Sequence, residues 1–405
     1  MYKSNIYVNV ILYYVYMTSE MKRIVVLGGG TGGSIMINKL AHGLRDHLRD
    51  GKVSITVVNP SSRHYYQPAF LLIPVGIMDE REAYTSFNSL VPEGVRWVKT
   101  SANKIDIGDN RIVLDNGQSI EYDYLVVSTG AVLDPGRIKG LDRTSHFYSF
   151  KASIELKKAL ANFKGGKIVI GPSSIPYRCP PAPIEMTLIL RDYFDRRGIS
   201  DKVEITYFYP LPRVFPIERV SELLHSILDS KGIETSLMFN LDYVDVERRR
   251  LVSMEGEELE YDLAIVVPPH RGSDVIINSG LGDEDGWVDV DRYTLNVEGY
   301  ENVYVIGDAT NLPVSKAGSV ADFQAEVVVK RIIDDIEGFE PTAKYNGKTM
   351  CFVLTGIGKA TVLVFDYNNP PPVIPPSFLY YWLKLAYNKL YWSVTAKSIL
   401  SGVVL

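Results

Sequence analysis

Cysteine is scarce in this 405-residue sequence, which contains only Cys179 and Cys351. Two cysteines cannot build the disulfide framework of a small secreted domain, so a bond between them would be catalytic rather than structural. Isolated cysteines are also often inert, buried small hydrophobic residues, and the spacing of these two does not decide between the alternatives.

Dense clusters of positive charge are absent as well. The formal net charge is -5 and no run of lysine and arginine stands out, which argues against a nucleic-acid partner. The histidines, among them His64 and His270, are too scattered to predict a metal site. The composition, with 46% hydrophobic and 22% charged residues, is that of a globular enzyme with two or three domains.

The N-terminal segment has no apolar run long enough to span a bilayer. Residues 6–17 are apolar and rich in tyrosine, but they are too few for a transmembrane helix, and Lys3 alone makes a weak start for a signal peptide. We interpret residues 1–21 as a disordered tail or a misassigned start, and we expect the fold to begin at Lys22. A weak export signal is the alternative.

The first motif of the fold is a strand, a glycine turn and a helix. A short β-branched run at residues 23–27 is followed by Gly-Gly-Gly-Thr-Gly-Gly at 28–33 and by a helix-like stretch at 34–48. A second strand at 53–58 completes a βαβ unit of the length that binds a dinucleotide.

Each glycine of this turn has a predicted role. Gly28 permits the tight turn, Gly30 lets the backbone approach a pyrophosphate, and Gly33 lets the helix pack on the strand. Thr31 lies between them and is assigned to the same cofactor site. Asn59 stands where an acidic residue usually binds the ribose hydroxyls, and its amide can still form hydrogen bonds to them.

A second pattern occurs twice along the chain. Residues 102–130 contain short strands around a hairpin turn and close on Thr129 and Gly130, which we assign to the cofactor site. Residues 243–269 repeat this pattern. Two similar halves predict an α/β fold with two Rossmann-like, dinucleotide-binding domains.

An acidic residue follows a later strand. The apolar run within residues 301–309 ends in Gly307 and Asp308, and a carboxylate there can accept a hydrogen bond from the ribityl chain of a flavin. A plain Gly-Asp turn is the alternative. Lys316 precedes a helix-like run at 319–336 and would stabilise negative charge on a reduced flavin or a quinone, unless it is a surface lysine.

The second nucleotide turn lacks most of its glycines. Residues 171–176 are Gly-Pro-Ser-Ser-Ile-Pro, which places rigid prolines where backbone amides should approach a pyrophosphate. The next strand, at 203–208, ends without an acid for the ribose. We therefore predict a degenerate nicotinamide site. Cys179 lies just beyond it, and Glu185, six residues later, would be an acid/base group or a solvated carboxylate at a helix start.

The C-terminal region has a different character. A proline-rich break at residues 368–376 precedes a run at 377–392 that is dense in tryptophan, tyrosine and leucine, with sparse lysines. This composition is typical of an amphipathic helix in a membrane interface, so we expect a peripheral membrane protein. A helix that docks on the core or on a dimer seam is the alternative.

Taken together, these motifs resemble the flavoprotein family of sulfide:quinone oxidoreductase and flavocytochrome c sulfide dehydrogenase, which has the glutathione-reductase-like fold. The similarity covers residues 22–363, and Arg-Cys-Pro-Pro-Ala-Pro-Ile-Glu at 178–185 is its most specific stretch. The resemblance implies FAD, a redox disulfide between Cys179 and Cys351, oxidation of sulfide to zero-valent sulfur, and electron transfer through FAD to quinone.

Two departures from the family pattern refine these expectations. Many quinone-reducing members carry a third cysteine in the region that corresponds to residues 147–151, where this chain has none, so the length of the sulfur product stays open. The flavocytochrome members bind FAD covalently through a cysteine, and residues 63–66 here are Arg-His-Tyr-Tyr. FAD is therefore expected to be noncovalent, and quinone is favoured over a cytochrome as acceptor.

These expectations define a domain plan and its rivals. We predict an FAD-binding domain in two parts, residues 22–150 and 271–345, a second Rossmann-like domain at 151–270, and a C-terminal region at 346–405 with the second redox cysteine. The cytoplasmic face of a membrane is favoured, and a homo-oligomer stays open. The rivals are a type II NADH:quinone dehydrogenase, which would need an intact second nucleotide turn, and a non-enzymatic flavin or disulfide redox sensor.

Overall fold

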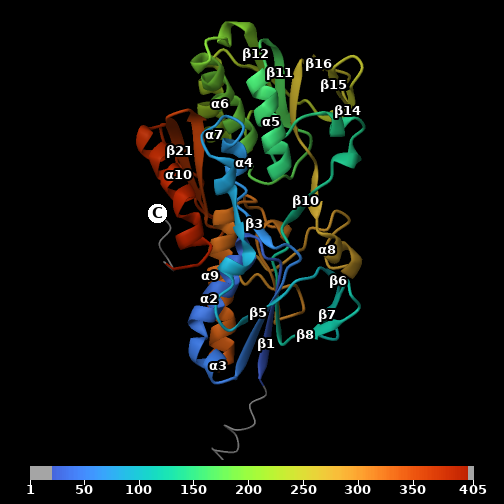
Figure 1. Cartoon of the computed structure of the whole chain (residues 1–405), viewed down its shortest axis with the longest axis vertical. Helices are drawn as coiled ribbons and strands as arrows, with labels where there is room; N and C mark the ends of the chain where they lie inside the picture. The colour runs from blue at the N-terminus through green and yellow to red at the C-terminus, as the bar shows by residue number, and fades with distance from the viewer. Residues whose placement is uncertain (1–20, 400–405) are drawn as a thin grey trace, which may run out of the picture.

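The computed structural model describes residues 21–399 and consists of two α/β domains with a C-terminal layer packed along them (Figure 1). The central sheet of the first domain is wholly parallel, in the order β19-β9-β1-β2-β5. Its strands are β1 (Lys22–Leu27), β2 (Val53–Val58), β5 (Val95–Val98), β9 (Tyr124–Val127) and β19 (Val303–Val305).

Side chains alternate between two cores on either side of this sheet. Ile24 and Val26 of β1 pack with helices α2 (Thr31–Gly43) and α9 (Gly318–Ile336). Val25 and Leu27 face the small antiparallel sheet formed by β6 (Ala102–Asp106), β7 (Arg111–Leu114) and β8 (Ser119–Glu121), together with α8 (Asp274–Ser279). Burial on both faces explains why these strands are almost continuously apolar.

The second domain repeats the plan. Its parallel sheet has the order β13-β12-β11-β17, from β11 (Gly166–Pro172), β12 (Val203–Tyr209), β13 (Glu234–Leu237) and β17 (Leu263–Val267). An antiparallel sheet follows, from β14 (Leu241–Asp245), β15 (Arg250–Ser253) and β16 (Glu258–Glu260). The helices are α5 (Phe150–Asn162), α6 (Ala182–Arg196) and α7 (Glu218–Ser230). The predicted α/β fold with two Rossmann-like domains is confirmed.

Smaller elements connect the two domains and extend the first. An antiparallel ribbon of β10 (Ala131–Leu133) and β18 (His270–Gly272) crosses between the domains. The first domain also contains α3 (Arg45–Arg49), β3 (Arg63–Tyr65), α4 (Ala69–Leu72) and β4 (Tyr84–Ser86). Short 3-10 helices span Glu80–Ala83, Phe87–Leu90, Pro135–Arg137, Leu141–Arg143, Ser200–Lys202 and Gly307–Ala309.

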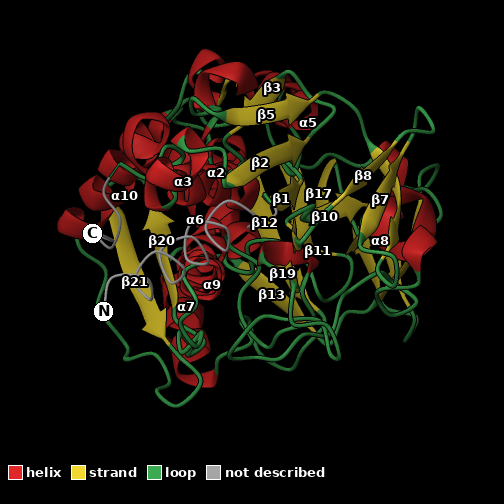
Figure 2. Ribbon diagram, turned by 90° about the horizontal axis from the view of Figure 1, so that it is seen from below, coloured by secondary structure: helices red, strands yellow, loops and turns green. Residues whose placement is uncertain are grey.

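The C-terminal layer is a hairpin and a helix. Strands β20 (Thr349–Gly356) and β21 (Lys359–Phe365) pair antiparallel, and α10 (Phe378–Leu390) packs on them before a π-helical turn at Tyr391–Thr395. Figure 2 shows this layer beside α6, α7 and α9, so it contacts both domains.

Helix α10 has two different faces. Tyr381, Lys384 and Asn388 are buried, whereas Phe378, Leu379 and Trp382 are each more than 60% exposed. The predicted amphipathic helix is therefore present, and one face of it docks as the alternative expected. Among residues 21–399, no helix is both long and apolar enough to cross a bilayer.

Candidate active site

The main cavity lies where the glycine turn, the second domain and the C-terminal layer meet. It has a volume of about 840 Å³. Cofactor-site candidates of the first domain line it together with both cysteines: Gly28, Gly30, Thr31, Asn59, Thr129, Gly130, Gly307, Asp308, Lys316, Cys179, Cys351 and Glu185. Gly33, the remaining glycine predicted for the cofactor site, is not among the residues that line the cavity. The structure thus brings together residues that are up to 323 positions apart in sequence.

The glycine turn forms a cradle that side chains would fill. Gly28 has a φ of 107°, a conformation that favours glycine, and a Cβ there would overlap the backbone of Ser128. A Cβ on Gly33 would overlap the carbonyl of Gly28. Gly30 is the N-cap of α2 and faces open space, and Thr31 begins the helix. A helix N-terminus with open backbone amides fits the pyrophosphate of a dinucleotide.

The remaining cofactor candidates surround this cradle. Asn59 follows β2, and its amide nitrogen donates to Ser61 O at 2.8 Å, which leaves its oxygen to accept from a ribose. Thr129 accepts a hydrogen bond from Ser273, and Gly130 has a φ of 67°. Gly307 donates its N–H to Gln324 at 2.6 Å. Burial raises the pKa of Asp308.

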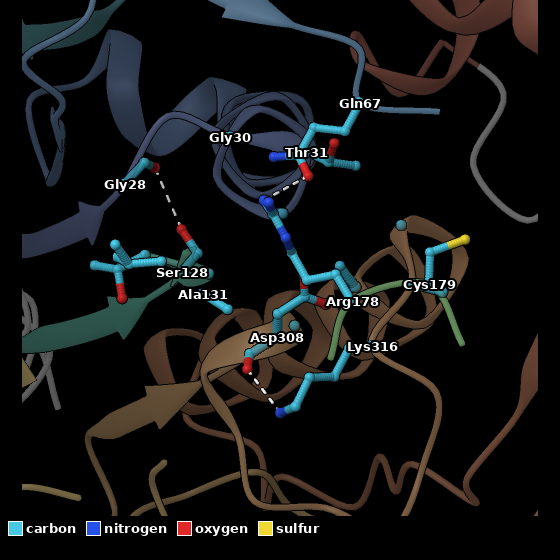
Figure 3. A pocket seen from close by; sticks show the side chains of 18 of the residues that line it. Gly28, Gly30, Thr31, Gln67, Ser128, Ala131, Arg178, Cys179, Asp308 and Lys316 are labelled. Atoms are coloured by element: carbon cyan, nitrogen blue, oxygen red, sulfur yellow. Dashed lines mark hydrogen bonds between the residues drawn. The ribbon is translucent and has the colours of Figure 1, made fainter. Parts of the chain in front are cut away.

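Lys316 lies at the cavity wall, but its ammonium is already engaged. Nζ donates to the carbonyls of Asp308 and Thr310, each at 2.9 Å, and lies 3.8 Å from the ring centre of Trp287. Burial lowers its pKa to about 8. In Figure 3 this side chain points away from the glycine turn. Lys316 therefore holds the turn that carries Asp308, and its predicted role at the flavin stays a prediction.

Arg178 also lines the cavity, and although it begins the 178–185 stretch, the sequence predicted no role for it. Its guanidinium donates to Gln67 Oε1 at 2.7 Å and to Tyr148 O at 3.1 Å, and points toward the glycine turn in Figure 3. Its Nε is buried without a partner. A free donor beside the carboxylate of Asp308 and an open glycine cradle together fit the polar and anionic groups of FAD.

The two cysteines belong to different elements. Cys179 lies in the loop before α6 with a φ of 51°, and its N–H donates to Lys316 O at 2.8 Å, which fixes the loop on the first domain. Cys351 lies in β20. Both thiols are free and partly buried. Burial raises the pKa of both thiols, that of Cys351 to about 12. A disulfide between them stays a prediction.

Glu185 is buried beside the cysteines and is not a solvated carboxylate. It is 1% exposed and accepts hydrogen bonds from Leu354 N, at 2.6 Å, and from Lys384 Nζ of α10. The acid/base role predicted for Glu185 therefore has a geometry that can support it. Lys384 was missed because no local pattern links it to a residue 199 positions earlier.

Comparison with known proteins identifies the family. Residues 22–325 match the pyridine nucleotide-disulphide oxidoreductase family. The mitochondrial sulfide:quinone oxidoreductase of Dictyostelium discoideum is 32% identical over 363 residues, 86% of this chain and 78% of that protein. The chain belongs to the sulfide:quinone oxidoreductase family. The family predicted from the sequence is confirmed, and the protein is an oxidoreductase.

Further relatives agree with this family. The mitochondrial sulfide:quinone oxidoreductase of Mus musculus is 31% identical over 360 residues, 86% of this chain and 79% of that protein. The crystal structure of the Aquifex aeolicus sulfide:quinone oxidoreductase superposes with a TM-score of 0.81 at 23% identity, covering 93% of this chain and 91% of that one. Proteins of this family are flavoproteins, which implies FAD as the cofactor.

The C-terminal layer also contacts the glycine turn. The hydroxyl of Tyr391 lies 2.9 Å from Thr31 Oγ1 and 2.7 Å from His64 Nε2. His64 is 2% exposed, its Nδ1 lies 2.9 Å from Gly29 O, and burial lowers its pKa to about 4, so the ring is neutral at pH 7. His64 and Tyr391 are thus structural supports of the cofactor turn that sequence inspection had no means to pair.

We predict that Gly33→Ala and Gly30→Ala impair FAD binding for different physical reasons. The Gly33 Cβ would collide with the backbone of Gly28, so this variant should lose both FAD and thermal stability. The Gly30 Cβ meets nothing in the protein, so Gly30→Ala should fold normally and retain less FAD because the cofactor cannot approach closely. The ratio of flavin to protein absorbance after gel filtration and the melting temperature measure both effects.

Gly108→Ala is the matched control, since Gly108 is exposed and open on all sides. A Gly33→Ala protein with normal FAD content would contradict the packing role given to this glycine.

Proposed function

We propose that this protein oxidises sulfide at a redox disulfide of Cys179 and Cys351 and passes the electrons through FAD to a quinone. The observation that carries the proposal is that the two cysteines of the chain line one cavity with the dinucleotide turn. FAD, when bound, supplies the two-electron acceptor between the thiols and the quinone. The family to which the chain belongs supports the same reaction.

The protein chemistry begins with thiol–disulfide exchange. A hydrosulfide ion attacks one sulfur of the Cys179–Cys351 bond, so that bond breaks while a new sulfur–sulfur bond forms. One cysteine then carries a persulfide and the other becomes a thiolate. The substrate sulfur gives two electrons to the disulfide, and they remain on the released thiolate, from which FAD, when bound, would accept them. Glu185 would accept the proton of the persulfide.

Nicotinamide binding is disfavoured by how the second domain is packed. A Cβ on Gly171 would overlap the carbonyl of Phe208, so this glycine serves the contact of β11 with β12, and the turn after it continues with Pro172 and Pro176 in place of glycines. The side chains of Tyr177 and Tyr209 are buried at the ends of the neighbouring elements, with their hydroxyls 3.5 Å apart. Aromatic side chains thus occupy the region where an adenine ribose would need polar partners.

Noncovalent attachment of FAD is part of the proposal. Cys179 and Cys351 are the only thiols of the chain, and the residues after β2, including His64 and Tyr66, are buried and hydrogen-bonded to the C-terminal layer. We therefore expect trichloroacetic acid to release the flavin into the supernatant. Yellow colour in the washed precipitate would show a covalent bond instead.

The central test compares two reductants under anaerobic conditions. Sulfide should bleach the oxidised flavin band of the purified protein within a turnover time, whereas an equal concentration of NADH should leave it almost unchanged. Cys179→Ser and Cys351→Ser should each lower the rate of sulfide-driven bleaching by at least about 10³-fold with FAD retained, because one thiol cannot exchange without the other.

The double serine variant sharpens this test. It should be no slower than either single variant, since residues that act as a unit are not additive. Near-normal turnover in either single variant would exclude the disulfide mechanism, and rapid bleaching by NADH would favour a type II NADH:quinone dehydrogenase.

The exposed face of α10 supports a peripheral membrane location. Phe378, Leu379 and Trp382 are exposed side by side on one surface of this helix. Burying an apolar side chain contributes roughly 1.5–3 kcal/mol, so three partly inserted side chains suffice for reversible binding. Quinones dissolve in the lipid bilayer, so an enzyme that binds the bilayer through this face could take up quinone directly from the lipid.

We predict that Phe378→Ser, Leu379→Ser and Trp382→Ser combined weaken cosedimentation with liposomes at least about tenfold, the equivalent of about 1.4 kcal/mol. Deleting the whole helix is a poorer test, because Lys384 and Tyr391 would be lost with it. The control is Phe339→Ser with Met254→Ser, which removes two side chains of 64% and 72% exposure elsewhere on the surface. Equal liposome binding by the triple variant would place the membrane contact on another surface.

A further inference from the structure

Lys384 joins the three elements that build the thiol site. Its Nζ donates to Glu185 on α6 and, at 2.9 Å, to the carbonyl of Phe352 on β20. The lysine itself is 8% exposed and comes from the buried face of α10. One ammonium group therefore connects the helix that follows Cys179 with the strand that carries Cys351.

This ion pair is held in place by further contacts and lines the cavity. Glu185 Oε1 accepts from both Lys384 Nζ and Leu354 N, so the carboxylate is fixed between α10 and β20. Phe352 is the residue after Cys351, and Glu185 stands in the first turn of α6, just beyond Cys179. The charges of the pair are therefore held at fixed positions close to both sulfurs.

The two members of the pair act on the thiols with opposite signs. Burial is the largest cause of the raised pKa of Cys179 and Cys351; beyond it, the carboxylate of Glu185 raises both values and the ammonium of Lys384 lowers them, with the carboxylate exerting the larger effect of the two. The charged and titratable groups that face the thiols are Glu185, Lys384, Arg178, Tyr66, Tyr148 and Tyr387. Among these described groups, Lys384 is the cation that acts on both cysteines.

We propose that Lys384 is a positioning residue of the sulfide half-reaction, which holds Glu185 in place as proton acceptor and stabilises the thiolate released when the disulfide opens. This inference rests on the proposed function. When hydrosulfide opens the disulfide, one negative charge passes from the substrate to the departing cysteine, and the proton of the new persulfide moves to Glu185. The site then carries the additional negative charge that the hydrosulfide brought, and a fixed ammonium offsets it.

The positive charge of Lys384 matters in addition to the way its side chain packs. Removing one partner of a buried ion pair leaves the other uncompensated in a medium of low polarity. A neutral side chain at position 384 would leave Glu185 as the dominant charge beside two thiols, which disfavours any thiolate. Arginine at position 384 would preserve the charge but change the shape of the side chain. Comparing Lys384→Arg with Lys384→Met therefore separates the effect of charge from the effect of shape.

The test measures thiol reactivity directly and needs neither sulfide nor quinone. The reduced, FAD-loaded protein is desalted anaerobically and treated with iodoacetamide between pH 6 and pH 10, and alkylation of each cysteine is followed by mass spectrometry. Because the thiolate is the reactive form, a higher thiol pKa moves the whole rate profile to higher pH. We expect Lys384→Met to slow alkylation of both cysteines at least tenfold at pH 8, and Lys384→Arg to stay within about threefold of wild type.

Lys389→Met is the matched control on the same helix, since Lys389 is exposed and pairs with Glu82. It should leave the alkylation profile unchanged. An unaltered profile in Lys384→Met would overturn the proposal, and so would an equal loss in Lys384→Arg and Lys384→Met, because charge would then not be the property that matters.

A second comparison covers the case in which Lys384→Met does not fold. Glu185→Gln and Glu185→Gln/Lys384→Met differ only in the ammonium, and neither leaves a buried, unpaired carboxylate. Alkylation should be at least tenfold slower in the double variant, and equal rates would overturn the proposal. If the serine variants of the cysteines kept sulfide turnover, the proposed function would fail while the alkylation result would still stand.

Discussion

A carboxylate and an ammonium buried together beside two thiols are the interaction on which this structure depends. Glu185 and Lys384 are 199 residues apart, and their pairing brings α6, β20 and α10 to one point. Enclosing these charges is costly unless they also form hydrogen bonds, and Leu354 N donates to the carboxylate while Phe352 O accepts from the ammonium. The cavity that contains both cysteines is therefore closed by the same groups that set its electrostatics.

The second domain shows how a nucleotide fold can be converted to another use. Its parallel sheet and crossover helices are those of a dinucleotide-binding domain, but the first turn carries prolines and leads into the Cys179 loop. Buried tyrosines replace polar partners around the turn. The domain thus retains its framework, and the loop after its first strand carries Cys179 in a left-handed conformation next to the first domain.

Local patterns predicted the fold well because they depend on neighbouring residues. The glycine turn at Gly28–Gly33, the repeated hairpins and the degenerate turn at Gly171 are all short segments whose chemistry is visible in sequence. Lys384, Tyr391 and Arg178 were missed because their partners are distant in sequence and come together only through tertiary packing.

Lys316 shows a different limit of sequence reasoning. The sequence predicted it near the flavin, but only the structure shows that two carbonyl groups and the ring of Trp287 hold its ammonium. The aromatic run in α10 was predicted to lie at a membrane. In the structure the helix has two faces, and the one with Tyr381, Lys384 and Asn388 is buried in the protein core.

The contact between Tyr391 and Thr31 spans 360 residues and has a consequence for biosynthesis. A nascent chain exposes its glycine turn as soon as the first βαβ unit leaves the ribosome, and N-terminal domains generally fold first. The hydroxyl that supports this turn is added 360 residues after Thr31. A partly synthesised chain that has not reached Tyr391 therefore has the glycine turn without this support.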